Sequence, residues 1–488
     1  MAAGGALPGW AVGLSIFGTY LSSNTFLGVP GKAYGENFNG FVFSLSLPLA
    51  AFIATRFFVP FYRRTGEISA YHHLERRFGL WARTYAVACY LLTQIARTGT
   101  ILFGVALGLQ ALTDWPVVWI IVITGVLVTL YTLLGGIEAV IWTDVIQSLV
   151  LLAGALLVLG TLLLDAPEGP RRAVTLAADQ GKFSLGSFAL DPTTSTVWVM
   201  LLFGLFINLN NFGIDQSFVQ RFHTAKSDRE AGRAIWLGAL LYVPVSLLFF
   251  VIGAMLFSFY EMRPELLTEV RQQVAAEQLA TERLFSAVPT ATEVAARAES
   301  LAAKEIGDQV LPHFLTTQLP PGLAGLLIAA IFAAAMSSVD TSLNSSATVF
   351  LKDIVQRYFS PAISEPGAMA VLRVATIGMG LLGTGVALAL IGEESILEAW
   401  WLLQGVFAGG LLGLFLLGII SRRAGNPEAL TATSIGVGVI AWMTLSPRAE
   451  SLPPALRNGL HANLTIVLGT LTIFGVGLVL SRFRRPGE

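Results

Sequence analysis

Charged residues are scarce in this sequence, and cysteine is almost absent. Asp, Glu, Lys and Arg make up 12% of the 488 residues, well below the roughly 25% of a soluble domain. The formal net charge of −1 argues against a nucleic-acid partner, which requires a basic surface. Cys89, the only cysteine, excludes a disulfide within the chain and a thiolate metal site. Since 54% of the residues are hydrophobic, the composition predicts a membrane protein.

The groups that enzymes and sensors need are also missing. A membrane enzyme requires a nucleophile, a metal cluster or paired acids at one depth. The histidines do not supply them, because His72, His73 and His223 fall in expected loops. No cofactor fingerprint, signalling domain or low-complexity tail is recognisable. The sequence therefore predicts neither an enzyme nor a sensor.

Long apolar runs recur along the chain, each about as long as a bilayer is thick. They predict an all-α integral membrane protein with about twelve membrane-spanning helices. The expected segments are residues 9–29, 41–62, 84–112, 115–134, 139–164, 196–212, 234–259, 322–354, 367–391, 396–420, 429–446 and 463–481.

Basic residues between these segments indicate the orientation of the chain. Clusters such as Arg63, Arg64, Arg76 and Arg77 follow the second segment, and others follow the sixth, tenth and twelfth. All of them lie on one side if both termini do, as an even number of segments requires. Short basic loops stay in the cytoplasm, so we expect both termini to be cytoplasmic and the protein to lie in the plasma (inner) membrane. Residues 165–195 and 260–320 then lie outside, the second as a solvated loop with one or two surface helices.

The segment 322–354 carries a ladder of hydroxyl groups. Ala334, Ser337, Ser338 and Thr341 are spaced so that they share one helical face, with Asp340 at its edge. Polar groups in hydrocarbon are costly and mark ion or substrate paths. Hard oxygen donors without His or Cys suit an alkali cation, so this face predicts part of a Na⁺ site.

The first segment should be interrupted. Residues 18–31 (GTYLSSNTFLGVPG) combine hydroxyls, an amide and several helix-weakening residues. Irregular backbone survives at membrane depth only where it lines a cavity or a binding site. A broken helix of this kind offers carbonyl groups to an ion and N–H groups to a substrate.

These features resemble the sodium/solute symporters, a family that includes bacterial sodium/sialic-acid and sodium/sugar transporters. The resemblance runs from residues 7–15 (LPGWAVGLS) to about residue 420. It is carried by the first helix, by 135–147 (GGIEAVIWTDVIQ), by 215–221 (DQSFVQR) and by 334–345 (AAMSSVDTSLNS) followed by 351–354 (LKDI). Family members usually carry one more helix before the Leu7 position. The sequence leaves open whether this chain lacks that helix or starts downstream of it.

The resemblance implies a LeuT-type inverted repeat of five plus five helices. Residues 1–420 would form the transporter core, with 9–164 as the first repeat and 196–420 as the second. Residues 429–488 would add two peripheral helices and a tail.

The resemblance also implies Na⁺ as the coupling ion. The main site would consist of the carbonyl groups of Gly18, Leu21 and Ala334 and the hydroxyls of Ser337 and Ser338. Asp144 matches an acid used in Na⁺ passage, and with Asp340 and Thr341 it would form a second Na⁺ site. Replacement of that ion by H⁺ is the alternative, because like charges close together split their pKa values.

Substrate contacts are implied on four helices. Arg97 matches an arginine that holds a carboxylate in sialic-acid transporters, and a guanidinium binds a carboxylate through two hydrogen bonds. Its alternative role is a salt bridge to a protein acid. The other implied contacts are Tyr20, Ser22, Thr25, Asn208, Asn211, Trp401 and Gln404.

We therefore expect Na⁺-coupled symport of an acidic sugar or another carboxylate by alternating access. The alternatives are a neutral-sugar symporter, a channel and an H⁺-coupled carrier. The expected partners are the substrate, Na⁺ and the lipid bilayer, and a monomer would suffice.

Overall fold

The structure is a computed structural model that describes residues 7–22, 24–65, 69, 71–113, 115–133, 137–282, 289–449 and 451–483. Within its helices, the side chains at 111–112, 137–144, 280–282, 321, 330 and 334 lie outside this description. Regular structure in the described ranges is helical throughout. This arrangement confirms the predicted all-α fold class.

The first half of the chain contains five apolar passages, the first of which is interrupted after α1. Their helices, with the short helices between them, are α1 (Gly9–Tyr20), η2 (Asn24–Gly28), α2 (Val29–Gly35), η3 (Phe38–Phe41), α3 (Val42–Leu45), α4 (Leu47–Ile53), η4 (Ala54–Phe58), α5 (Val59–Thr65), α6 (His72–Phe78), α7 (Leu80–Thr113), α8 (Val117–Thr132), α9 (Ile137–Leu164) and α10 (Pro170–Asp179).

The second half repeats this pattern with a long loop inserted and two helices added. Its elements are α11 (Val197–Ile214), α12 (Gln216–Thr224), α13 (Asp228–Glu261), α14 (Pro264–Glu282), α15 (Ala291–Ser300), α16 (Ala303–Thr317), α17 (Pro321–Val349), η5 (Phe350–Phe359), α18 (Glu365–Ala389), α19 (Ile396–Ile420), α20 (Asn426–Leu445), η6 (Ser446–Arg448), η7 (Pro454–Leu456) and α21 (Leu464–Phe483).

Ten helices in the described ranges are long and apolar enough to cross a membrane, and α8 is a shorter apolar helix. Together with the interrupted α1–α2 passage, they correspond to the segments expected from the sequence, so the chain is a multi-pass membrane protein. The boundaries differ where capping extends a helix beyond its apolar run. For example, α13 begins at Asp228 rather than near residue 234, because the Ser227 hydroxyl accepts a hydrogen bond from the Glu230 N–H.

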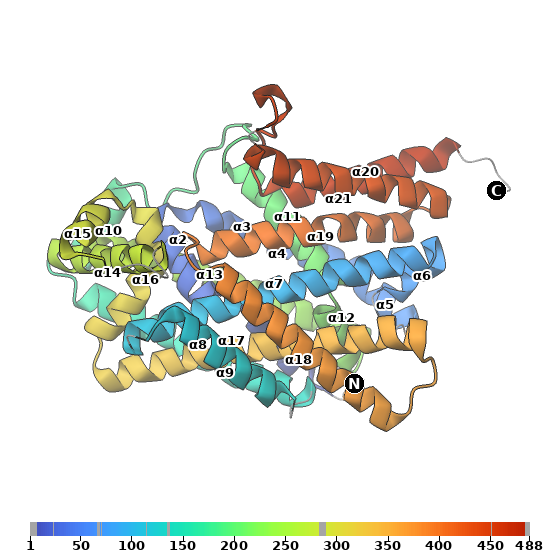
Figure 1. The fold of residues 1–488 in the computed structure, drawn as a ribbon, viewed down its shortest axis with the longest axis horizontal. Helices are drawn as coiled ribbons and strands as arrows, with labels where there is room; N and C mark the ends of the chain where they lie inside the picture. Colours follow the sequence, from blue (N-terminus) through green and yellow to red (C-terminus); the bar gives the residue numbers. More distant parts are fainter. Residues whose placement is uncertain are drawn as a thin grey trace.

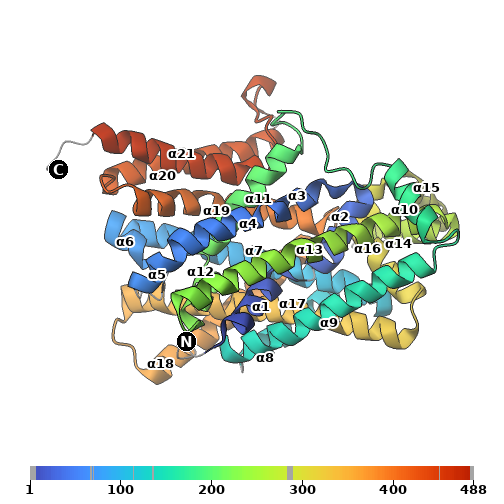
Figure 2. The same cartoon turned by 180° about the vertical axis from the view of Figure 1, so that it is seen from behind.

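The helices form one elongated bundle (Figures 1 and 2). Helices α10 and α14–α16 gather at one end, and α5, α6 and α12 lie at the other. Helices α20 and α21 lie along one side, where they pack on α19. Helix α7 packs against α17, α18 and α19 and so holds the middle of the bundle.

The long loop differs from the expectation of a solvated cap with one or two helices. It contains three helices, and residues Ile306–Leu315 of α16 are buried. Helix α16 packs on α2 through a backbone contact, since a Cβ placed on Gly307 would lie 2.5 Å from the Gly31 carbonyl oxygen. The reason is the small side chains on both faces, which let two backbones meet as they do between membrane helices.

Substitution of Gly307 by alanine tests this contact. Because the added methyl group must push α16 away from α2, we expect the free energy of unfolding to fall by about 1–3 kcal/mol. Thermal unfolding of the purified protein in detergent measures the change. Gly325→Ala is the matched control, because its Cβ would meet nothing within 4 Å. Equal effects of the two substitutions would contradict the close contact.

Asp308, the next residue of α16, predicts a pH dependence of stability. Its carboxylate accepts the Ile396 N–H at 2.7 Å, and burial is the main cause that raises its pKa from 3.8 to about 7. The hydrogen bond and Lys32 oppose this rise, and Glu398 adds to it. Between these two pH values the folded state binds the proton that the unfolded state has released, so stability falls as pH increases.

We therefore expect the unfolding temperature to decrease as the pH rises from 3.8 to about 7 and to level off above that value. Asp308→Asn keeps an acceptor for Ile396 and removes the titration, so it should flatten this dependence. Burial also raises the pKa of Glu277 to about 7, and a smaller slope should therefore remain. An unchanged slope in Asp308→Asn would contradict the assignment.

Candidate functional site

One face of α7 holds the interrupted helices in place. Tyr90, Gln94 and Arg97 follow at helical spacing and therefore share that face. The Tyr90 hydroxyl donates to Ser345 Oγ of α17 at 2.7 Å. Gln94 and Arg97 each bond to a position where a neighbouring helix is interrupted, Gln94 to Asp215 and Arg97 to Thr19.

The first break lies between α1 and η2. Leu21 leaves the helix with an extended backbone, φ −89° and ψ 102°. Arg97 Nη2 donates to the Thr19 carbonyl at 2.7 Å, and the Thr25 hydroxyl donates to the Tyr20 carbonyl at 2.6 Å. Both bonds satisfy carbonyl groups that the interrupted helix leaves unpaired.

The second break lies between α11 and α12, at Asp215. Its side chain caps α12 by accepting the Ser217 N–H at 2.8 Å. Its other oxygen accepts Gln94 Nε2 at 3.2 Å, and because a carboxylate only accepts, the amide nitrogen of Gln94 must face it. Arg221 of α12, fully buried, donates to Ser15 Oγ of α1 at 2.9 Å and so ties the two interrupted helices together.

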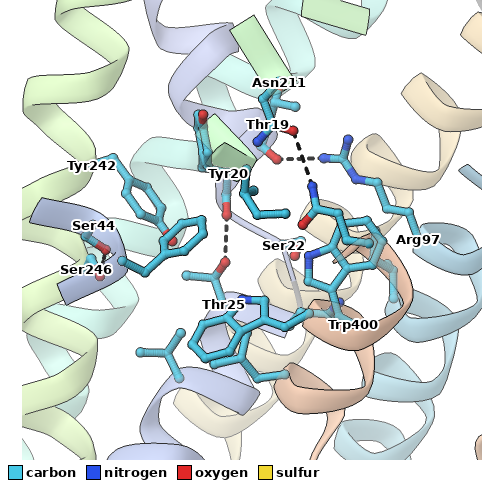
Figure 3. Close-up of a pocket in the computed structure, with 18 of the residues that line it drawn as sticks. Thr19, Tyr20, Ser22, Thr25, Ser44, Arg97, Asn211, Tyr242, Ser246 and Trp400 are labelled. Carbon is cyan, nitrogen blue, oxygen red and sulfur yellow. Dashed lines mark hydrogen bonds between the residues drawn. The ribbon is translucent and has the colours of Figure 1, made fainter. Parts of the chain in front are cut away.

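A cavity of about 90 Å³ lies between these breaks. Its walls are polar at two ends and aromatic between them (Figure 3). Arg97 lies at one end, and the hydroxyls of Ser44 and Ser246, 2.7 Å apart, lie at the other. Gln404 Nε2 donates to Asn211 Oδ1 at 3.2 Å in another part of the wall, where Asn211 lies near Thr19 (Figure 3). Among the described residues, no acid lies within ion-pair distance of Arg97.

An aromatic group closes the cavity toward the α14–α16 end. The Trp401 ring stacks on Phe43 with centroids 5.8 Å apart, and it meets Phe203 edge-on at 5.5 Å. Lys32 Nζ lies 5.6 Å above the Trp401 ring and pairs with Glu398 at 2.8 Å. A vestibule of about 620 Å³, lined by charged side chains that include Lys32 and Glu398, lies on the far side of Trp401.

A charged network joins helices at the opposite end of the bundle. Arg83 of α7 pairs with Asp353 of η5 at 2.6 Å and with Glu75 of α6 at 2.6 Å. Arg357 Nε also donates to Glu75 at 2.8 Å. Burial opposes the charge of Glu75, but the hydrogen bonds from Arg357 and Arg83 outweigh it and lower its pKa. This network ties α6, α7 and η5 together at that end.

The structure brings most of the predicted substrate contacts to the cavity. Those that line it are Tyr20, Ser22, Thr25, Arg97, Asn211, Trp401 and Gln404. Asn208 does not, because it is fully buried behind Tyr20 and bonds to protein groups on both sides of its amide.

The predicted residues of the main Na⁺ site lie on α1 and α17, two helices that both pack against α9. Gly18 and Leu21 flank the end of α1, where helical hydrogen bonding stops. Ser337 and Ser338 are buried on α17. The Ser338 hydroxyl makes no hydrogen bond with a described residue, which suits a group that binds a cation. Ala334 belongs to α17, but its side chain is outside the described set.

The predicted second site is only partly described. Asp144 lies on α9 with its side chain outside the described residues. Asp340 is buried and accepts hydrogen bonds from the Tyr131 hydroxyl at 3.2 Å and from Asn344 Nδ2 at 2.9 Å. Thr341 is buried beside it. The carboxylate of Asp340 is therefore hydrogen-bonded within the protein, to groups of α8 and α17.

Several cavity residues were missed in the sequence. They are Ser44, Gln94, Asp215, Tyr242, Ser246, Phe250 and Trp400. Asp215 stands in a motif that carries the family resemblance, which was a usable signal. The serines gave none, because serine is common in membrane helices and the rotation of each helix decides which face meets the cavity.

Comparison with known proteins places this architecture in a family. Residues 1–436 match the model of the sodium:solute symporter family. The sodium/sialic acid symporter NanT of Aliivibrio fischeri is 33% identical over 445 residues, which cover 90% of this chain and 81% of the relative. The sodium/sialic acid symporter SiaT of Proteus mirabilis is 33% identical over 474 residues, 96% and 88% of the two chains.

The structural comparison agrees. A solved Na⁺-coupled sialic acid symporter in a substrate-bound outward-open state matches with a TM-score of 0.82 at 30% identity, covering 100% of this chain and 92% of that one. The likeness extends over all helices of the bundle and confirms the LeuT-like architecture. The chain belongs to the sodium:solute symporter family.

Proposed function

We propose that the protein couples the entry of Na⁺ to the uptake of a small organic carboxylate of the acidic-sugar type, by alternating access. The observation that carries this proposal is Arg97. Its guanidinium faces the cavity at membrane depth and has one backbone carbonyl as its hydrogen-bond partner among the described residues.

A guanidinium in such a place calls for an anion. Removing a charge from water costs several kcal/mol unless a counter-charge and hydrogen bonds replace the lost hydration. One N–H of Arg97 serves Thr19, and the others remain for a ligand. A carboxylate fits them because it accepts two parallel N–H groups. The relatives named for sialic acid, which transport an anionic sugar by name, point the same way.

The ion would bind between α1 and α17. Carbonyl groups at Gly18, Leu21 and Ala334 and the hydroxyls of Ser337 and Ser338 are neutral oxygen donors, which replace the hydration shell of a monovalent cation. Because the donors belong to two helices, occupancy favours one relative position of these helices and shifts the population of that state. The Na⁺ gradient then supplies the work.

A second Na⁺ at Asp144, Asp340 and Thr341 belongs to this proposal, and an H⁺ in its place is the alternative. A neutral sugar as substrate would add no counter-charge to Arg97 beyond that of Asp215, which lines the same cavity, whereas a carboxylate would. A channel would need a continuous path, whereas the Trp401 ring and its aromatic neighbours cover the cavity on the side of the vestibule. The chain carries out transport and no catalysis.

The orientation follows from the basic loops. Both termini would be cytoplasmic, in the plasma (inner) membrane, so that α14–α16 and the vestibule face outward. Residues 1–420 would act as the core, with the repeats 9–164 and 196–420, and residues 429–488 as peripheral helices. A monomer contains the whole site.

Arg97→Ala should abolish the Na⁺-dependent uptake of a carboxylate substrate. Loss of a charge-assisted pair weakens binding by about 100-fold or more. Uptake into proteoliposomes and thermal shifts with glucuronate, each in NaCl and in choline chloride, measure the effect. Arg97→Lys keeps the charge without the planar fork and should recover only part of the affinity. Stabilisation by NaCl alone should persist; its equal loss would indicate that Arg97 is structural.

Ser338→Ala should raise the Na⁺ concentration needed for half-maximal uptake. A single ligand hydroxyl contributes about 1.5–3 kcal/mol to a charged partner, so the increase should be about 10- to 100-fold. Ser342→Ala, one turn further along α17, is the matched control, because its hydroxyl bonds to the Ser338 carbonyl instead. The same Na⁺ dependence in wild type and Ser338→Ala would refute the assignment.

A further inference from the structure

We propose that Tyr20 is a size filter that restricts the substrate to compact hydroxylated carboxylates. This inference rests on the proposed function and narrows the substrate class of the same cavity. It explains why Asn208, an amide expected to contact a sugar, takes no part in the cavity wall.

Tyr20 seals a polar recess behind it. Its hydroxyl donates to Asn208 Oδ1 at 3.0 Å, and Asn208 Nδ2 donates to Ser46 Oγ at 3.1 Å. Ser46 in turn donates to the Phe43 carbonyl at 2.8 Å. The amide and the hydroxyls are thus paired inside the protein, and Asn208 is fully buried. With a small side chain at position 20, the amide of Asn208 and the hydroxyl of Ser46 would face the cavity instead.

The ring of Tyr20 is held by three aromatic neighbours. Its centroid lies 5.0 Å from that of Tyr242, 5.6 Å from Phe218 and 6.3 Å from Phe212. Its backbone carbonyl accepts the Thr25 hydroxyl. Turning the ring aside would break the bond to Asn208 and leave two buried polar groups unpaired, which costs about 1–3 kcal/mol for each group. The ring is therefore a fixed wall and not a movable one.

The space that remains is small. The cavity volume is about 90 Å³. Typical small-molecule pockets measure roughly 300–1,000 Å³. The molecule that fits is therefore closer in size to a short hydroxy acid or a single acidic hexose than to a sialic acid with its glycerol and N-acetyl arms.

The chemistry of the walls defines this molecule further. Arg97 at one end suits a carboxylate, and the paired hydroxyls of Ser44 and Ser246 at the opposite end suit a hydroxyl group (Figure 3). The amides of Asn211 and Gln404 bond to each other and keep further donors and acceptors in the wall. The geometry fits a ligand with a carboxylate at one end and hydroxyls at the other.

The experiment compares ligands of increasing size on purified protein. Dissociation constants of lactate, glucuronate and N-acetylneuraminate are measured by thermal shift in NaCl, with choline chloride as the control. We expect N-acetylneuraminate to bind the wild type at least about tenfold more weakly than glucuronate, since overpacking a rigid cavity costs more than 1 kcal/mol. Tyr20→Thr should reduce the ratio of the two dissociation constants, N-acetylneuraminate over glucuronate, by about tenfold or more, because it opens the recess at Asn208.

Tyr20→Phe is the matched variant. It keeps the bulk of the ring and loses the hydroxyl, so it should retain the wild-type order of preference. A reversed order in Tyr20→Phe would show that the hydrogen bond and not the size of the ring selects the substrate, and would overturn the proposal.

The remaining outcomes distinguish failure of the size filter from failure of the proposed carboxylate symport. Equal Na⁺-dependent binding of glucuronate and N-acetylneuraminate to the wild type would overturn the size filter and leave carboxylate symport in place. This comparison needs no variant, so a poorly folding Tyr20→Thr would not prevent the decision. A folded Tyr20→Thr variant that keeps the wild-type ratio of the two dissociation constants would also overturn the size filter. No Na⁺-dependent binding of any carboxylate would remove both the filter and the proposed function.

Discussion

Backbone that leaves a helix inside a membrane must find hydrogen-bond partners within the protein, and one face of α7 supplies them here. Arg97 serves the break at Thr19, and Gln94 serves the break at Asp215. Tyr90, on the same face, bonds to α17. Helix α7 therefore fixes the positions of α1, α12 and α17 relative to one another. The cavity exists because these three side chains hold the breaks apart and facing each other.

The two ends of the bundle are held by different kinds of contact. Toward the vestibule, the Trp401 ring packs on Phe43 and Phe203, beneath a lysine paired with Glu398. At the other end, Arg83 bridges Asp353 and Glu75. Aromatic contacts tolerate small rotations, whereas a buried ion pair is costly to separate into its charges. Opening toward each side thus draws on separate interactions, as alternating access requires.

Much of this molecule could be predicted from the sequence. The membrane-spanning segments were recognisable because length and hydropathy alone determine them. Arg97 was recognisable because a charged side chain at membrane depth marks a functional or paired group. The loop helix α16 was expected to be solvated, because its composition does not reveal that Gly307 meets Gly31. Asn208 was expected at the substrate, and Tyr20 covers it. Ser44 and Ser246 were missed. These differences depend on which side chain faces which neighbour, and helix rotation within the bundle decides that.

Arg97 donates to the carbonyl of Thr19, the residue after Gly18. The peptide groups that would bind the ion and the side chain that would bind the carboxylate thus meet on one short length of backbone, from Gly18 to Leu21. A charge placed at either position polarises and orders this segment for the other. Thermodynamic linkage then requires that each ligand raise the affinity of the other by the same factor. Whichever of the two arrives first, the doubly bound protein has the same free energy, so the order of binding is a matter of kinetics and concentration.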